Sequence, residues 1–578
     1  MTTMPNYDSV PGGYAQAAAG AQVHNGVKRW LNNYKQLDRQ YDQTGFKSLH
    51  QELAQYICLG RGRFIDRGQQ ANANSRAAQK VVNNSATDAL HILGAGLHGG
   101  LSSPARPWFK LGFQDREMEK FRIYRNWLDD CEKALYAVFK RSNFYSIIHH
   151  LYEEEGGFGN GAMWMEAHPK NVVNFIVFTA GDYRFTVKDD GRTHTIYRYF
   201  RQQAAQAAQA FGYENLSERS QRMVKVSPHE WVDIYHVLEP NEQHNPEKDG
   251  SFPWMSCYFE ANTERDDKRL SYGGYQECPV VTPRWMPLSN EAWGWGPGAE
   301  SLQLVKALQK MELSSIKAAD KMIDPPTSVP PTMRDRMVDL SPGARNVLDE
   351  ANTKIEPIVV INPMAIKVFG EKIQIIENRI RRNFFNDIFM MIANTPLGGE
   401  KMTAAEIVAR EQEKRSIMGP VVESQEYECL DLVVERTFAL AARAGQLPPP
   451  PPELQGVEYR VEFVSILAQA QKLLYGQGMM SYLTTAERVA AFNPESIAKT
   501  NWDQFLENTA DLLGMQSDNL HDDDEAGEIR NAAAQQAEQE RQVMAGAAEV
   551  DAMAKLGKTP APAEDNALGQ MVDAATEE

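Results

Sequence analysis

The chain has 578 residues, of which 42% are hydrophobic and 24% charged, and its formal net charge is −17. This length exceeds one ordinary hydrophobic core, so two to four domains are expected. No run of 18 apolar residues is present and the start, MTTMPNYDSVPGGYAQ, lacks a basic and an apolar region, so we expect neither a membrane-spanning helix nor a secretory signal.

The charge and the cysteines are distributed unevenly. Residues 511–578 hold 16 acidic and 4 basic residues, whereas the other 510 hold 61 and 56, so the acidity belongs to the tail and the body is nearly neutral. Five cysteines lie far apart without a C-x-x-C pair, which predicts reduced thiols and neither a disulfide framework nor a zinc site. They are Cys58, Cys131, Cys257, Cys278 and Cys429.

The first half of the chain reads as helices followed by strands. Apolar residues at spacings of three and four predict helix over most of 27–100 and over 117–155. Strand-forming β-branched and aromatic residues predict a mixed, β-rich region from about 170 to 290, and Asp190-Gly191 between two alternating runs predicts a hairpin. A short helix is expected within 201–212, ending at Gly212.

The second half is mostly helical. A helix over 300–323 is stopped by the prolines of DPPTSVPP, and a second over 366–394 carries one apolar seam from Ile373 to Ile392. A flexible loop, 395–401, precedes long helices over 402–454, which begin with the capping box Thr403-x-x-Glu406. More helix is expected over 455–524, then an acidic Ala/Gln-rich tail over 525–578 with a disordered end.

The stretch GAGLHGGLSSPARPWFKL, residues 94–111, contains the pattern G-x-G-x-x-G at Gly94, Gly96 and Gly99. A dinucleotide-binding loop needs a strand before these glycines and a helix after them. NNSATDALHIL before them predicts helix, and SSPARP after them cannot open one. The pattern therefore disfavours a nucleotide-binding enzyme, which we retain as the alternative function.

Other chemical signatures are weak. His149, His150 and Glu153 fall on neighbouring turns of a predicted helix and could bind a metal, but H-E-x-x-H is absent and a solvated polar face is the favoured interpretation. There is no G-x-x-x-x-G-K-[ST] and no G-x-S-x-G. We expect no catalytic residues, no metal and no cofactor.

The helix over 300–323 has two unlike faces. At 100° per residue, four lysines fall within about 60° of one another, opposite an apolar face that includes Leu304, Leu308 and Met311. The lysines are Lys306, Lys310, Lys317 and Lys321. Such a row is either a solvated face or a contact for the phosphate backbone of a nucleic acid that is not read by sequence.

Several segments, in one order along 85–475, resemble the portal, or head-to-tail connector, proteins of short-tailed bacteriophages. They are GGLSSPARPWFKL (99–111), EEEGGFGNGAMWME (153–166), the block from RWM to GWGPGAESLQLVKALQKME (284–312), IDPPT, MTAAEIVAREQEK (402–414), ERTFALAARAGQLPPPP (435–451) and VEFVSILAQAQK (461–472).

The resemblance implies a mixed α+β, helix-rich fold with wing, stem, clip and crown, in a ring of typically twelve copies around a DNA channel at one capsid vertex. The implied segments are wing (1–299, helical to about 169 and β-rich over about 170–290), first stem helix (300–323), clip (324–365), second stem helix (366–394), tunnel loop (395–401), wing helices (402–454), crown (455–524) and tail (525–578).

It also implies roles and partners. The four lysines would face double-stranded DNA, and the 94–111 stretch would be a structural elbow in which glycines end a helix. The tunnel loop is Thr395, Pro396, Leu397, Gly398, Gly399, Glu400 and Lys401, and the elbow uses Gly94, Gly96, Gly99, Pro104, Pro107, Trp108 and Phe109. Expected partners are the large terminase of the packaging motor, major capsid and scaffolding proteins, and tail adaptor or nozzle proteins. Another virion scaffold or tail protein is the second alternative.

Overall fold

The computed structural model describes residues 15–16, 26–64, 81–114, 118, 121–245, 250–261, 269–287, 291–328, 339, 356–358, 362–393, 418–452, 459–463, 481–488, 505–506, 509 and 523–556. The chain divides into two compact units: Met1–Arg116 with Trp127–Gln471, and Glu117–Asn126 with Lys472–Glu578. The expected tunnel loop, 395–401, lies outside the described residues. Within the described part of the chain, no helix is both long and apolar enough to cross a membrane.

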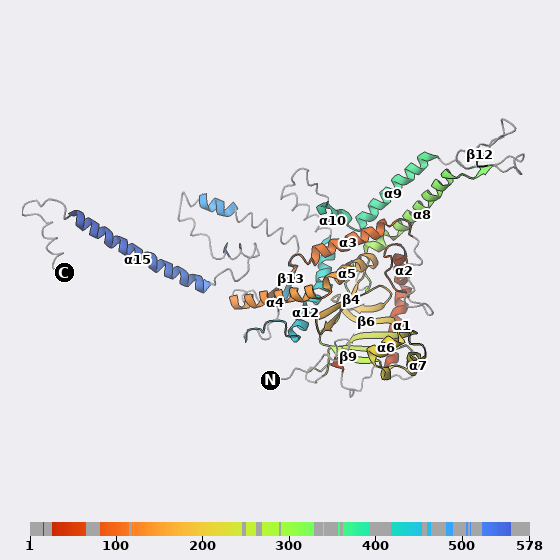
Figure 1. Ribbon diagram of the computed structural model, residues 1–578, viewed down its shortest axis with the longest axis horizontal. Helices are drawn as coiled ribbons and strands as arrows, with labels where there is room; N and C mark the ends of the chain where they lie inside the picture. The colour runs from red at the N-terminus through yellow and green to blue at the C-terminus, as the bar shows by residue number, and fades with distance from the viewer. Residues whose placement is uncertain are drawn as a thin grey trace, which may run out of the picture. The chain divides into compact units, whose positions relative to one another are not determined.

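Among the described residues before β3, five helices lie in the regions where the apolar spacing predicts helix (Figure 1). They are α1 (Val27–Gln43), α2 (Phe46–Tyr56), α3 (Ser85–Leu101), α4 (Arg122–Arg141) and α5 (Phe144–Phe158). Gly45 separates α1 from α2, and Gly159 ends α5; both have positive φ, where a side chain would be strained.

The β-rich region forms two antiparallel sheets. The larger has the order β1-β9-β8-β7-β6-β5 and the smaller β10-β3-β4. The strands are β1 (Ala15–Gln16), β3 (Ala162–His168), β4 (Val172–Phe178), β5 (Tyr183–Val187), β6 (Thr193–Gln203), β7 (Trp231–Pro240), β8 (Trp254–Glu260), β9 (Ser271–Tyr275) and β10 (Val280–Val281).

Two local predictions in this region are confirmed. The hairpin at Asp190-Gly191 joins β5 to β6, and Gly191 has φ 82°. The short helix is α6 (Ala204–Phe211), and Gly212 caps it with φ 88°. A 3₁₀ turn (Tyr213–Asn215) and α7 (Glu218–Val226) follow before the next strand.

The core lies on both faces of the six-stranded sheet. On one face α1 packs Val27, Trp30 and Tyr34 against Val237 and Phe259 of the central strands. On the other, Trp164 and Phe178 of the smaller sheet meet side chains of the larger sheet, including Tyr183, Phe185 and Leu238. The central strands therefore bury side chains on both faces, as Val237 and Leu238 of β7 show.

The elbow prediction needs correction in its first part. Helix α3 continues through Gly94, Gly96 and Gly99 and ends only at Leu101, so these glycines do not end the helix. The chain turns over 102–108 and enters strand β2 (Phe109–Phe113), with Trp108 and Phe109 buried in an aromatic cluster. β2 pairs antiparallel with β13 (Tyr459–Phe463), which the sequence prediction placed among helices.

The described C-terminal part is helical. Residues 418–425 are α-helical and lead into a π-helical turn (Glu426–Leu430) and α12 (Asp431–Arg443). In the second unit, helix α15 (Asp523–Leu556) covers the first part of the acidic tail. The expected crown, 455–524, is divided between the two units. Its first part, which includes β13, belongs to the first unit, and the residues from Lys472 onward belong to the second.

Candidate channel-forming arm

Two long helices of the first unit lie side by side and form an arm. They are α8 (Pro297–Ile323) and α9 (Pro363–Asn383). Figure 1 shows the C-terminal end of α8 and the N-terminal end of α9 beside a two-stranded ribbon of β11 (Thr327–Ser328) and β12 (Glu356–Pro357). Both helices begin with proline, whose fixed φ suits the first helical position. The side chain of Asn362 caps α9 by accepting from the Met364 amide at 2.9 Å.

The predicted single helix over 366–394 is wrong at its C-terminal end. It breaks after Asn383, and α10 (Asn386–Ala393) follows. Phe385 has φ 55°, a left-handed conformation that a helix cannot contain. Phe384 is fully buried at this break and the Phe385 ring lies 6.1 Å from that of Trp285, so tertiary packing interrupts a continuous apolar seam.

A group of hydrogen bonds around Asn83, in the turn before α3, connects this turn to both helices of the arm. We call this group the polar clasp, and the part of the arm that it contacts the base. Asn83 donates to Glu312 of α8 at 3.0 Å and to Glu377 of α9 at 2.7 Å. Gln309 of α8 is 3% exposed and bonds the backbone of the same turn three times, at 2.7, 2.8 and 3.0 Å. Sequence reasoning missed the clasp because Asn83 lies more than 200 positions away from Gln309, Glu312 and Glu377.

The glycines of α3 allow two close approaches. A Cβ at Gly96 would lie 2.3 Å from the ring of Phe389 in α10, and one at Gly94 would lie 2.7 Å from Cγ of Glu153 in α5. A Cβ at Gly99 would meet nothing within 4 Å. The G-x-G-x-x-G pattern therefore serves helix packing, and the strand and turn that a dinucleotide-binding loop requires are absent from this described stretch.

The structure divides the row of lysines. The Nζ atom of Lys306 forms an ion pair with Glu52 of α2 at 2.6 Å and lies over the Tyr56 ring. Lys310, Lys317 and Lys321 are exposed, on the side of α8 away from its buried residues, which include Leu302, Val305 and Leu308. These three lysines span about 16 Å along the helix at 1.5 Å per residue.

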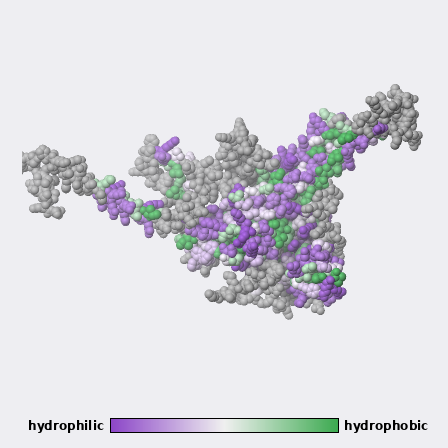
Figure 2. Space-filling model, viewed as in Figure 1, coloured by the Kyte–Doolittle hydropathy of each residue, from purple (hydrophilic) through white to green (hydrophobic). Residues whose placement is uncertain are grey.

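The arm also exposes large apolar side chains, and Figure 2 shows hydrophobic residues along it. On α8 they are Leu313, Ile316, Met322 and Ile323, and on α9 Met364, Val368, Phe369 and Ile375. Ile323 is 84% exposed and Ile375 56%. Large apolar side chains left exposed along one part of a protein are typical of a surface that contacts another molecule.

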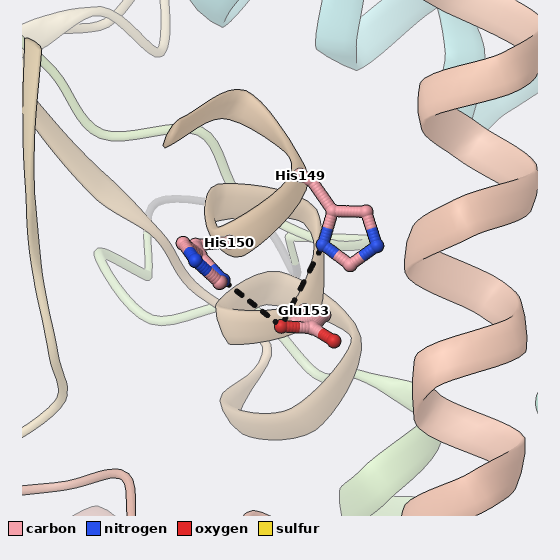
Figure 3. Close-up of side chains that lie close together, drawn as sticks. All are labelled: His149, His150 and Glu153. Atoms are coloured by element: carbon pink, nitrogen blue, oxygen red, sulfur yellow. Dashed lines mark hydrogen bonds and ion pairs between the residues drawn. The ribbon is translucent and has the colours of Figure 1, made fainter. Parts of the chain in front are cut away.

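The histidine and carboxylate group on α5 differs from the solvated polar face that we expected. Glu153 is 2% exposed, because its side chain packs against the backbone of α3 at Gly94. Nδ1 of His150 lies 3.3 Å and Nδ1 of His149 3.8 Å from Oε2 of Glu153 (Figure 3). His91 of α3 contacts the other carboxylate oxygen at 2.5 Å, and Arg61 forms an ion pair with Glu153.

Two further carboxylates are buried where the π-helical turn meets the body. Glu428 accepts from Arg284 at 2.6 Å and 3.2 Å, and each side chain is less than one-tenth exposed. Both oxygens of the fully buried Glu155 lack a hydrogen bond among the described residues. Burial raises the pKa of Glu155 well above its usual range, which favours the neutral form of the carboxyl.

The comparisons with known proteins agree in their descriptions. The family model for bacteriophage head to tail connecting protein matches residues 28–520. The chain is 31% identical to the probable portal protein of Bordetella phage BPP-1 over 521 residues, or 89% of this chain and 93% of that protein. It is 29% identical to the portal protein of Salmonella phage epsilon15, over 95% of this chain and 98% of that protein.

Solved structures of gene transfer agent particles match the chain more distantly. One is the neck of an empty gene transfer agent (GTA) particle, with TM-score 0.32 and 11% identity over 75% of this chain and 94% of that chain. Another is the virion of a native GTA particle, with TM-score 0.27 and 10% identity over 68% and 94%. The sequence matches show that the chain belongs to the bacteriophage head to tail connecting protein family.

Proposed function

We propose that copies of this portal protein close into a ring, of about twelve subunits by family resemblance, whose channel passes double-stranded DNA at the junction of phage head and tail. The exposed apolar side of the arm carries this proposal. A single subunit leaves Leu313, Ile316 and Ile375 in water, and burying them between neighbouring arms recovers about 25 cal/mol for each Å² of apolar surface. Side-by-side arms around an axis bury the same surface in every copy.

Lys310, Lys317 and Lys321 suit the wall of such a channel. Helices α8 and α9 together hold nine basic and five acidic residues, so the arm is positive within a chain of net charge −17. Each lysine that neutralises a phosphate releases condensed counterions and adds affinity without regard to sequence. Three exposed lysines per subunit make the contact weak and repeated, which permits DNA to slide.

The expected partners follow from the same assignment. The end of the arm, with β11 and β12, is the proposed clip that docks the packaging motor and later the tail adaptor. Hydrolysis of ATP is assigned to the motor, and the ring itself is proposed to act as a conduit and docking surface. The acidic tail, including α15, is proposed to extend the crown and to repel packaged DNA.

One experiment tests the lysines. Replacement of Lys310, Lys317 and Lys321 together by Gln is expected to lower the amount of DNA packaged and retained per particle, measured by quantifying nuclease-protected DNA. Lys306→Gln is the matched control, because its ammonium is already engaged by Glu52. Equal DNA retention by the triple variant and the parent would remove the lysines from the proposed mechanism.

A second experiment tests the ring. Native mass measurement and negative-stain images of the purified protein are expected to show closed rings, and Ile316→Asp with Ile375→Asp is expected to yield monomers that retain folded secondary structure. Glu300→Lys, an exposed change near the start of α8, is the control for altered charge. Monomers or open filaments from the parent chain would contradict the proposal.

A further inference from the structure

The group around Glu153 has the geometry of a metal-binding site. Ligand atoms on a tetrahedral metal at 2.0–2.1 Å lie about 3.3 Å apart, the spacing implied by zinc coordination. Oε2 of Glu153 lies 3.3 Å from Nδ1 of His150 and 3.8 Å from Nδ1 of His149. One ligand atom from each of the three residues lies within 4.8 Å of the other two, and Figure 3 shows the two imidazoles on either side of the same carboxylate oxygen.

We propose that His149, His150 and Glu153 bind one divalent transition-metal ion of the Zn²⁺ class, with water in the fourth position. His91 is assigned as the residue that orients the carboxylate, since it contacts the second oxygen, Oε1, at 2.5 Å. Outer partners of this kind hold a metal ligand in its binding orientation. The ion would thereby link α5, which supplies all three ligands, to α3, which supplies His91.

Solvent reaches the proposed site from one side. The side chains of His91 and His150 are 57% and 51% exposed, so an ion has a path from solvent to the buried carboxylate.

The guanidinium of Arg61 lies beside Glu153 and would compete with a metal ion for its carboxylate. Its Nη2 atom pairs with Oε2 of Glu153 and lies 3.2 Å from Nδ1 of His150, so the guanidinium stands where the ion would stand. Its Nη1 atom bonds Glu154 at 3.3 Å, a second carboxylate that keeps Arg61 paired when an ion takes Glu153. Metal ion and guanidinium are thus alternative cations for one buried carboxylate.

This competition makes the inference testable on the full-length chain without a histidine tag. After treatment with a chelator, calorimetric titration with Zn²⁺ is expected to show one site per chain, and Co²⁺ is expected to give visible absorption bands of a tetrahedral ion. Saturating Zn²⁺ should raise Tm by on the order of 5 °C, because a ligand that binds only the folded state stabilises it.

The variants separate the metal site from an ion-pair network that needs no metal. His150→Ala and His149→Ala should each weaken binding by about tenfold or more. Arg61→Gln should strengthen it, because the competing cation is gone, and His194→Ala, an exposed histidine on β6, should leave it unchanged. If His149→Ala does not fold, the Zn²⁺ affinities of His150→Ala and Arg61→Gln still test the proposed site.

Two results would overturn the proposal. One is the absence of saturable Zn²⁺ or Co²⁺ binding in both the parent and Arg61→Gln. The other is binding of equal strength in the parent and in His150→Ala, which would place the ion elsewhere on the chain.

Discussion

Adding one methyl group at Gly96 tests the packing of α3 against α10 most directly. In Gly96→Ala the new Cβ would lie 2.3 Å from Cγ and Cδ1 of the Phe389 ring, whereas ordinary contact lies between 3.4 and 4 Å, so the ring must move by more than 1 Å. Overpacking of this kind costs about 1–3 kcal/mol. Alanine in place of glycine within a helix returns about 0.5–1 kcal/mol. We therefore expect Gly96→Ala to lower the free energy of unfolding by up to about 2.5 kcal/mol.

Gly99→Ala is the matched control, because it makes the same change in the same helix at a position with nothing within 4 Å. Its expected effect is a gain of up to about 1 kcal/mol from helix propensity alone. The difference between the two variants isolates the clash, since propensity and the effect on the unfolded chain largely cancel. Urea unfolding followed by circular dichroism measures both.

A double-mutant cycle ties the clash to its partner. Phe389→Ala removes the ring, so Gly96→Ala in that background should behave like Gly99→Ala, with a coupling energy of about 1–3 kcal/mol. Equal stability changes for Gly96→Ala and Gly99→Ala in the parent would refute the reasoning. So would a Gly96→Ala cost that persists in the Phe389→Ala background.

Three further predictions concern polar groups that are buried or half-buried. Glu155 has a folded pKa raised above its unfolded value, so the folded state binds the extra proton and stability falls as pH rises above the unfolded pKa; Glu155→Gln should remove that fall, measured as Tm between pH 5 and 9. Glu428→Gln should cost about 3–5 kcal/mol in chemical unfolding, because it leaves the Arg284 guanidinium buried without its counter-charge, and a loss under 1 kcal/mol would contradict this. Asn83→Ala should cost about 1–3 kcal/mol and speed amide hydrogen exchange at the base of α8 and α9, and unchanged exchange there would exclude the clasp.

The sequence was sufficient to predict those features whose conformation depends only on residues close to one another along the chain. The hairpin at Gly191, the end of α6 at Gly212 and the stop of α8 before the prolines could all be predicted, because backbone permissiveness and the missing proline amide act within a few residues. The same is true of the β-rich region, where residue type signals a pleated, half-buried surface. Collinear motifs likewise identified the family before any geometry was known.

Contacts between distant segments decided the rest. The glycines of α3 follow a nucleotide-binding pattern, yet their role depends on Phe389 and Glu153, which only the fold brings against them. The break at Phe385 overrides a seam that is helical by every local measure, because burial of the Phe384 ring outweighs helix continuity. Lys306 belongs to the predicted lysine row but forms an ion pair with Glu52, and Glu153, which was expected on a solvated face, is buried against Gly94. The sequence alone does not predict either environment, since the free energy of a charged group is set by the neighbours and solvent around it.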